Sequence, residues 1–131
     1  MLTNQIFVFG SNTQGRHGKG AALYAKQNYG AINGVPEGRQ GMAYGIITKE
    51  LRKNYPAITI EDIAGGVVRF VEYANNHPDD SFYVTPIGCG LAGFNPKDIA
   101  PLFADAPNNV ELSKEFLEEL GLYFEQPNES S

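Results

Sequence analysis

The stretch FYVTPIGCGLAG at residues 82–93 decides the fold class. Its first half is a β-branched and aromatic run typical of a strand, and residues 88–93 follow with the pattern Gly-x-Gly-x-x-Gly. Asn95 and Pro96 then predict the start of a helix, because asparagine caps helix N-termini and proline suits the first helical position. A strand, a glycine-rich turn and a helix in this order are typical of α/β folds, whose ligands bind outside the carboxyl ends of parallel strands.

The rest of the chain repeats this alternation. Thr59 and Asp62 form a pattern typical of a helix N-terminus, and apolar residues follow at helical spacing. The connection after Gly30 is rich in glycine and reads as irregular. The predicted order is strand 5–9, helix 21–29, strand 43–48, helix 60–74, strand 82–87, helix 96–103 and helix 113–120. We therefore predict an α/β protein with a central, mostly parallel sheet flanked by helices.

Composition predicts a globular cytoplasmic protein. The chain has 131 residues, of which 42% are hydrophobic and 19% charged, and no apolar stretch approaches the ~20 residues of a membrane span. This length favours one domain, placed at residues 1–124, and the polar residues 125–131 are predicted to form a disordered tail. The single cysteine excludes an internal disulfide.

The charge distribution bears on partners. Residues 1–60 carry a net charge of +5, whereas the whole chain carries −5. Proteins that hold nucleic acid along a groove usually have a strongly basic domain, so no strong nucleic-acid groove is expected. A small anion bound near the N-terminal half agrees better with this distribution.

Three segments should meet at the carboxyl ends of the strands: the loop 10–20, Lys49 and the glycine-rich stretch 88–93. Glycine N–H groups can approach a phosphate closely, although the same glycines also suit a tight turn of purely structural role. A lysine amine can attack an electrophilic sugar carbon, although Lys49 beside Glu50 also fits a solvated charge pair. The sequence alone leaves both pairs of alternatives open.

His17 and Cys89 are residue types that can bind metals or act in catalysis, but the sequence favours a structural role for each. His17 is expected on the surface, because only one other histidine exists and no cluster predicts a metal site. Cys89 has no evident histidine partner in sequence, so a small loop residue is favoured over a nucleophile. We predict neither a metal nor a cofactor.

At three places the residues resemble the macro domain family. Asn12 with the run HGKGAALY at 17–24 resembles that family's first-strand asparagine and the start of its first helix, and IGCGLAGF at 87–94 resembles its diphosphate-binding loop. The stretch Ile-Thr-Lys at 47–49 resembles the nucleophilic lysine of the subgroup containing the terminal ADP-ribose protein glycohydrolase and the antitoxin that strips ADP-ribose from DNA.

The resemblance implies a three-layer macro-like fold that binds ADP-ribose or an ADP-ribosylated macromolecule, with Lys49 attacking the ribose C1″. It also implies that Phe94 stacks near a ribose or base. The implied ligand-binding residues are Ser11, Asn12, Gly18, Gly20, Ala21, Gly88, Cys89, Gly90, Leu91, Ala92, Gly93 and Phe94.

The sequence departs from the glycohydrolase at Ala92, where that enzyme has an aspartate that serves as acid and base. Another acid such as Glu50 or Asp98 could serve instead, or water and the ligand could suffice. Two alternatives to an enzyme therefore stay open: a binding module for ADP-ribose or a signal nucleotide, and an interaction protein that keeps only the fold.

Overall fold

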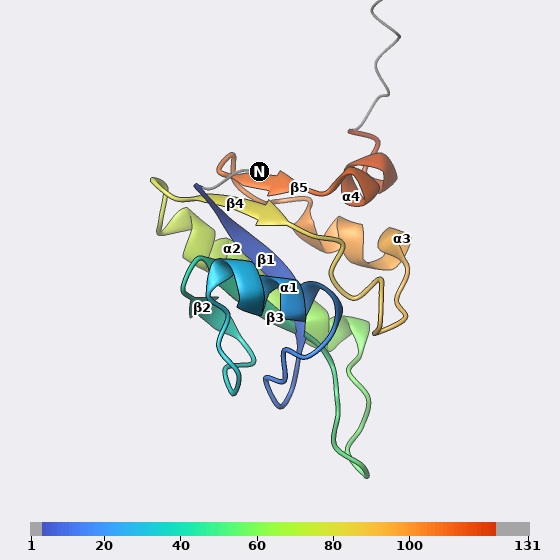
Figure 1. Cartoon of the computed structure of the whole chain (residues 1–131). Coiled ribbons are helices and arrows are strands. Elements are labelled where there is room, and N and C mark those ends of the chain that lie inside the picture. The colour runs from blue at the N-terminus through green and yellow to red at the C-terminus, as the bar shows by residue number, and fades with distance from the viewer. Residues whose placement is uncertain (1–3, 123–131) are drawn as a thin grey trace, which may run out of the picture.

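The computed structural model describes residues 4–122 and is built around one sheet. Its strands are β1 (Gln5–Asn12), β2 (Gly38–Gln40), β3 (Ala43–Lys49), β4 (Ser81–Val84) and β5 (Val110–Leu112). They lie side by side in the order β2-β3-β1-β4-β5 (Figure 1). Only β2 runs antiparallel to its neighbour, whereas β3, β1, β4 and β5 are parallel. The predicted mostly parallel sheet is confirmed.

Helices cover both faces of this sheet. The helix α1 (Gly20–Tyr29) lies on one face, and α2 (Ile60–Asn75) lies on the other, as Figure 1 shows. The C-terminal part adds the short elements α3 (Pro96–Ile99), the 3-10 helix η1 (Ala100–Phe103) and α4 (Lys114–Glu119). The result is a three-layer α/β fold, as predicted.

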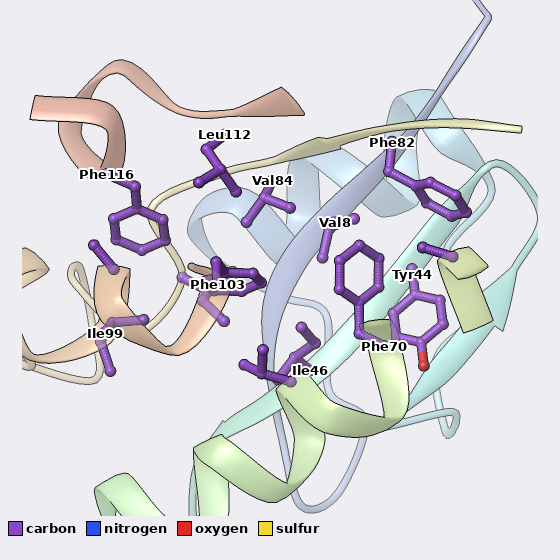
Figure 2. Close-up of a cluster of buried hydrophobic side chains, with 14 of the residues drawn as sticks. Val8, Tyr44, Ile46, Phe70, Phe82, Val84, Ile99, Phe103, Leu112 and Phe116 are labelled. Carbon is purple, nitrogen blue, oxygen red and sulfur yellow. The ribbon is translucent and has the colours of Figure 1, made fainter. Parts of the chain in front are cut away.

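Successive side chains of β1 point to opposite faces of the sheet, so this strand contributes to the hydrophobic cluster on each face. Ile6 and Val8 point to the α2 face, where they pack with Phe70, Phe82 and other buried side chains (Figure 2). Phe9 points to the opposite face and packs with alanines of α1. A strand buried on both faces reads as a continuous apolar run, which is why residues 5–9 were recognisable in the sequence.

Local sequence signals fix the ends of the two long helices. The Thr59 hydroxyl accepts a hydrogen bond from the Asp62 N–H, and the Asp62 carboxylate accepts one from the Thr59 N–H, so the capping box predicted for α2 forms. Gly30 ends α1 with φ of 84°, a left-handed conformation that favours glycine. Both signals were readable in the sequence.

Two predicted elements are shorter in the structure. β4 ends at Val84 and not at residue 87, because Pro86 has no N–H to continue the ladder. The helix predicted over 96–103 divides into α3 and η1, because Pro101 lacks the N–H needed for an α-helical hydrogen bond.

The connection after Gly30 contains a strand that was not predicted. β2 pairs with β3 through Gly38, Arg39 and Gln40, so the expectation of irregular structure throughout this stretch was wrong. The last helix matches its predicted position, and the Ser113 hydroxyl accepts a hydrogen bond from the Phe116 N–H at its start. The predicted tail 125–131 lies outside the described residues.

Candidate functional site

A cavity of about 860 Å³ opens at the carboxyl ends of the parallel strands, within the size range of small-molecule sites. We refer to it as the strand-end cavity. Its walls come from the three segments that the sequence placed there, from residues next to them along the chain, and from α3 and α4. The lining residues are Gly10, Ser11, Asn12, Arg16, Gly18, Lys19, Gly20, Ala21, Ala22, Thr48, Lys49, Leu51, Thr85, Pro86, Ile87, Gly88, Cys89, Gly90, Leu91, Ala92, Pro96 and Glu115.

The loop after β4 presents free hydrogen-bond donors to this cavity. Its shape is held by the Gly93 N–H, which donates to the Gly90 carbonyl, and by the Phe94 N–H, which donates to the Gly88 carbonyl. Within residues 4–122, no hydrogen bond is made by the N–H groups of Gly88, Gly90, Leu91 and Ala92. Adjacent backbone donors without partners form a concave site suited to an anion.

The N-terminus of α1 faces the same cavity. Gly20, Ala21 and Ala22 form its first turn and line the cavity, and no side chain caps this end of the helix. The first N–H groups of an α-helix have no partner within the helix, and the helix dipole adds partial positive charge there. Two independent sets of backbone donors therefore face one space.

Asn12 holds the first loop in shape. Its Oδ1 accepts hydrogen bonds from the N–H groups of Gln14 and Arg16, and its Nδ2 donates to the Arg16 carbonyl at 2.8 Å. The side chain thus closes the turn between β1 and α1 while it also lines the cavity. Its amide shapes the loop that brings Arg16 and Lys19 to the site.

Lys49 lies at the end of β3, beside Asn12 at the end of β1, and it lines the cavity. Its side chain makes no ion pair or hydrogen bond within the described chain, and neither do the side chains of Arg16 and Lys19. The charge pair that the sequence allowed between Lys49 and Glu50 does not form, because Glu50 binds Arg52. Three unpaired cations therefore line the cavity.

Glu50 begins the loop 50–59, which projects from the body of the molecule (Figure 1), and its carboxylate is fully used in contacts there. Its carboxylate accepts hydrogen bonds from the Thr13 hydroxyl at 2.6 Å and from Arg52 Nε and Nη2 at 3.0 and 2.9 Å. These donors, Arg52 first, lower the pKa of Glu50 from 4.5 to about 2. Glu50 is thus ionised at neutral pH and does not line the cavity.

We expect the Glu50 contacts to be lost only in strong acid. Because the folded-state pKa is depressed, the carboxylate favours the folded loop above pH 4.5, and this contribution falls as the pH drops toward 2. A carboxyl-carbon NMR titration should give Glu50 a midpoint near 2 and move the Arg52 amide resonance in parallel. Glu50→Gln should remove that movement, and a midpoint above 4 in the wild type would contradict the assigned contacts.

His17 is buried, so its predicted surface position was wrong. Its side chain is 0% exposed, its ring packs edge-on against Phe9 and Nε2 lies 3.2 Å from the Val35 carbonyl. The Asn33 side chain accepts a hydrogen bond from the His17 N–H. The loop 32–35 therefore covers the histidine. These contacts tie the first loop to residues 32–35, and His17 does not line the cavity.

The remaining candidates divide between the cavity and the core. Cys89 lines the cavity, and burial, with a smaller contribution from nearby carboxylates, raises the pKa of its thiol, which disfavours the nucleophilic thiolate. Phe94 packs against the hydrophobic core and, like Gly93, is absent from the cavity wall. Phe94 is only partly buried, and the stacking position implied for it stays a prediction.

Several cavity residues were not singled out from the sequence. By sequence, Arg16 and Lys19 could simply be solvated charges, and Thr85 and Leu51 carried no recognisable signal. Glu115 comes from α4, more than sixty residues after Lys49, and looks like any exposed helical glutamate. Only the register of the sheet brings these residues together.

Residues 4–122 lack two features. No helix is long and apolar enough to cross a membrane. No group of three or more His, Cys, Asp or Glu side chains is placed to hold a metal ion.

Comparison with solved structures finds several with the same fold. Thermosipho africanus DarTG in complex with ADP-ribose superposes with a TM-score of 0.57 at 18% identity over 86% of this chain, which spans 39% of the DarTG chain. The macrodomain of Mycobacterium tuberculosis DarG gives 0.56 at 18% identity, covering 85% of this chain and 88% of that one. A macrodomain protein from Streptomyces coelicolor gives 0.54 at 16% identity, over 82% and 86%. Neither a protein-family model nor a curated protein matches the sequence. The sheet order, the layers and these superpositions together show that the chain has the macrodomain fold.

Proposed function

We propose that this protein binds ADP-ribose in the strand-end cavity. The observation that carries the proposal is the meeting of two sets of unpaired backbone donors, at Gly88 with residues 90–92 and at the first turn of α1, on one cavity. A diphosphate has enough acceptor oxygens to engage both sets at once. A carboxylate or a single phosphate would satisfy only some of them.

The charges of the cavity wall support the same ligand. Arg16, Lys19 and Lys49 are unpaired cations, and Glu115 is the one carboxylate among the lining residues of the described chain. The lining therefore carries a net charge of about +2 although the whole protein carries −5. This local field favours a compact dianion such as a diphosphate. The neighbour with ADP-ribose bound adds independent support.

Calorimetric titration with ADP-ribose tests this proposal. A preformed anion site with a nucleotide slot predicts a dissociation constant of order 1 µM, about 8 kcal/mol of binding free energy. AMP and NAD serve as controls, and AMP should bind more weakly because it lacks the diphosphate. No heat and no thermal shift at millimolar ADP-ribose would exclude the nucleotide hypothesis.

We further propose that the protein removes ADP-ribose from a macromolecule through Lys49. The neutral Lys49 amine would bond to the ribose C1″ while the bond from C1″ to the acceptor breaks and its electron pair leaves with the acceptor. The ammonium formed loses a proton to water. A second water then adds its oxygen to the same carbon while the bond from C1″ to the lysine nitrogen breaks. One proton of that water passes to the nitrogen, which releases ADP-ribose and restores the neutral amine.

Proton transfer separates this enzyme hypothesis from a simple binding module. Ala92 cannot carry a proton, Glu50 is held ionised by Arg52, and Asp98 is absent from the cavity wall. Departure of the acceptor group would therefore depend on water or on the substrate itself. A binding module that reads ADP-ribose without turnover is the second candidate, and Ala92 is the residue that favours it.

A further inference from the structure

Arg16 lies between two buried residues of the loop that follows β1. Gly15 and His17 are buried, whereas Arg16 is exposed and lines the strand-end cavity. The Asn12 side chain bonds both the N–H and the carbonyl of Arg16. The backbone of Arg16 is therefore fixed, whereas its guanidinium makes no hydrogen bond or ion pair within residues 4–122 and is free to bind a ligand.

A second loop, 32–35, holds Gly15, the residue before Arg16. The Gly34 N–H donates a hydrogen bond to the Gly15 carbonyl at 2.9 Å. Gly15 has a φ of 64°, and a Cβ added there would lie 2.7 Å from the Val35 nitrogen, so only glycine fits between the two loops. This close approach fixes the position of Arg16 from its N-terminal side.

Asn33 holds His17, the residue after Arg16. Its Oδ1 accepts a hydrogen bond from the His17 N–H at 3.0 Å. The buried His17 ring adds a second contact, since its Nε2 lies 3.2 Å from the Val35 carbonyl, a group that can only accept. Asn33 itself is exposed and is absent from the cavity wall. Any effect of Asn33 on a ligand in the cavity must therefore pass through the loop that carries Arg16.

The loop 32–35 is in turn fixed to the sheet by Gln40, the last residue of β2. Gln40 is buried, its Oε1 accepts a hydrogen bond from the Ile32 N–H at 2.7 Å, and its Nε2 donates to the Val35 carbonyl at 3.0 Å. A series of hydrogen bonds thus runs from β2 through the second loop to the residues on either side of Arg16.

We propose that Asn33 is a positioning residue that holds the Arg16 guanidinium where it binds the diphosphate of ADP-ribose. This inference rests on the proposed binding of ADP-ribose and adds a residue that acts from outside the cavity. An arginine whose backbone is fixed before the ligand arrives loses less conformational freedom on binding. Hydrogen bonds between a guanidinium and phosphate oxygens are strong, so the placement of this one side chain matters for the affinity.

A double-mutant cycle with ADP-ribose as the ligand tests the proposal by calorimetry. Arg16→Ala should weaken binding about tenfold, and Asn33→Ala about fivefold, because the loosened loop presents the guanidinium less well. The double variant should bind like Arg16→Ala alone, since Asn33 acts only through Arg16. The control is Asn28→Ala, which removes an exposed asparagine of α1 that bonds the Tyr24 carbonyl and is absent from the cavity wall. It should keep the wild-type affinity.

The salt dependence of the affinity is a second readout, which a purely structural role of Asn33 would not change. Salt screens the attraction between the guanidinium and the diphosphate, so raising NaCl from about 50 to about 500 mM should weaken binding less in Arg16→Ala than in the wild type. Asn33→Ala should show a reduced salt dependence as well, and Asn28→Ala should not.

The outcomes separate this inference from the proposed function. Wild-type affinity in either single variant overturns the role of Asn33, and so does a double variant whose loss is the product of the single losses, about fiftyfold. A wild-type salt dependence in Asn33→Ala also overturns it. In these cases the wild type still binds ADP-ribose, and the proposed function stands.

Binding of ADP-ribose by none of these proteins overturns the proposed function and this inference with it. Arg16 and Asn33 are both exposed, so neither replacement is expected to unfold the protein. Thermal unfolding of each variant verifies that it is folded.

Discussion

Replacing Lys49 by alanine is expected to reduce the release of ADP-ribose from a modified macromolecule by at least about 1000-fold while the affinity for free ADP-ribose changes by less than about threefold. The reason is that the amine forms its bond to C1″ only as the reaction proceeds, whereas the backbone donors hold the diphosphate throughout. Single-turnover release from protein-linked and DNA-linked ADP-ribose measures the rate, and calorimetry measures the affinity.

Lys53→Ala is the matched control, because Lys53 belongs to the same segment but is absent from the cavity wall. It should leave the rate unchanged. Cyanoborohydride reduction during turnover should trap an ADP-ribosyl adduct on Lys49, provided that the ribose opens to the imine of a lysine adduct. Full activity in Lys49→Ala, or no release by the wild type from either substrate, would leave the binding module as the remaining function.

Gly90→Val is expected to weaken ADP-ribose binding by more than about 100-fold without unfolding the protein. Apart from Gly90 and its chain neighbours, no atom of residues 4–122 lies within 4 Å of a Cβ built at Gly90. The backbone there is not left-handed, so the valine fits the unliganded loop. The new side chain would instead occupy the space in which the donors of Gly90 and Leu91 meet the diphosphate. Calorimetry gives the affinity.

Gly65→Ala controls for glycine replacement elsewhere, since a Cβ at Gly65 makes only ordinary contact with the Arg69 side chain at 3.5 Å. It should bind ADP-ribose like the wild type. A folded Gly90→Val protein with wild-type affinity would show that the glycines of this loop serve only the turn. The glycine-rich loop would then be structural, and the ligand would have to lie elsewhere.

The predicted elements with strong local signals are those found in the structure. β1 and β3 are continuous apolar runs, and α2 begins at a capping box that its own residues form. β2 has no such signal, because Gly38, Arg39 and Gln40 form a strand only through pairing with β3. A three-residue strand stabilised by a partner cannot be read from its own side chains.

The site was predictable to the extent that it depends on strand ends. Parallel strands bring their carboxyl ends together, so Asn12, Lys49 and Gly88 could be placed at one edge from sequence order. The side chains that turn away from the cavity could not be predicted in this way. His17 is enclosed because a distant loop folds over it, and Phe94 packs inward beneath Gly88. The roles of the cavity residues in binding or catalysis stay predictions until the variants are measured.

The two edges of the sheet have a consequence for association between molecules. β2 and β5 are the outer strands, and each is three residues long. A strand from another molecule that docked on either edge would meet few backbone groups with which to pair, and so could not establish a stable register. The four-residue β4 and the long β1 and β3, which would offer a better template, lie inside the sheet, and β2 covers the first three residues of β3. The short outer strands therefore disfavour edge-to-edge pairing between molecules, the kind of pairing that leads to aggregation.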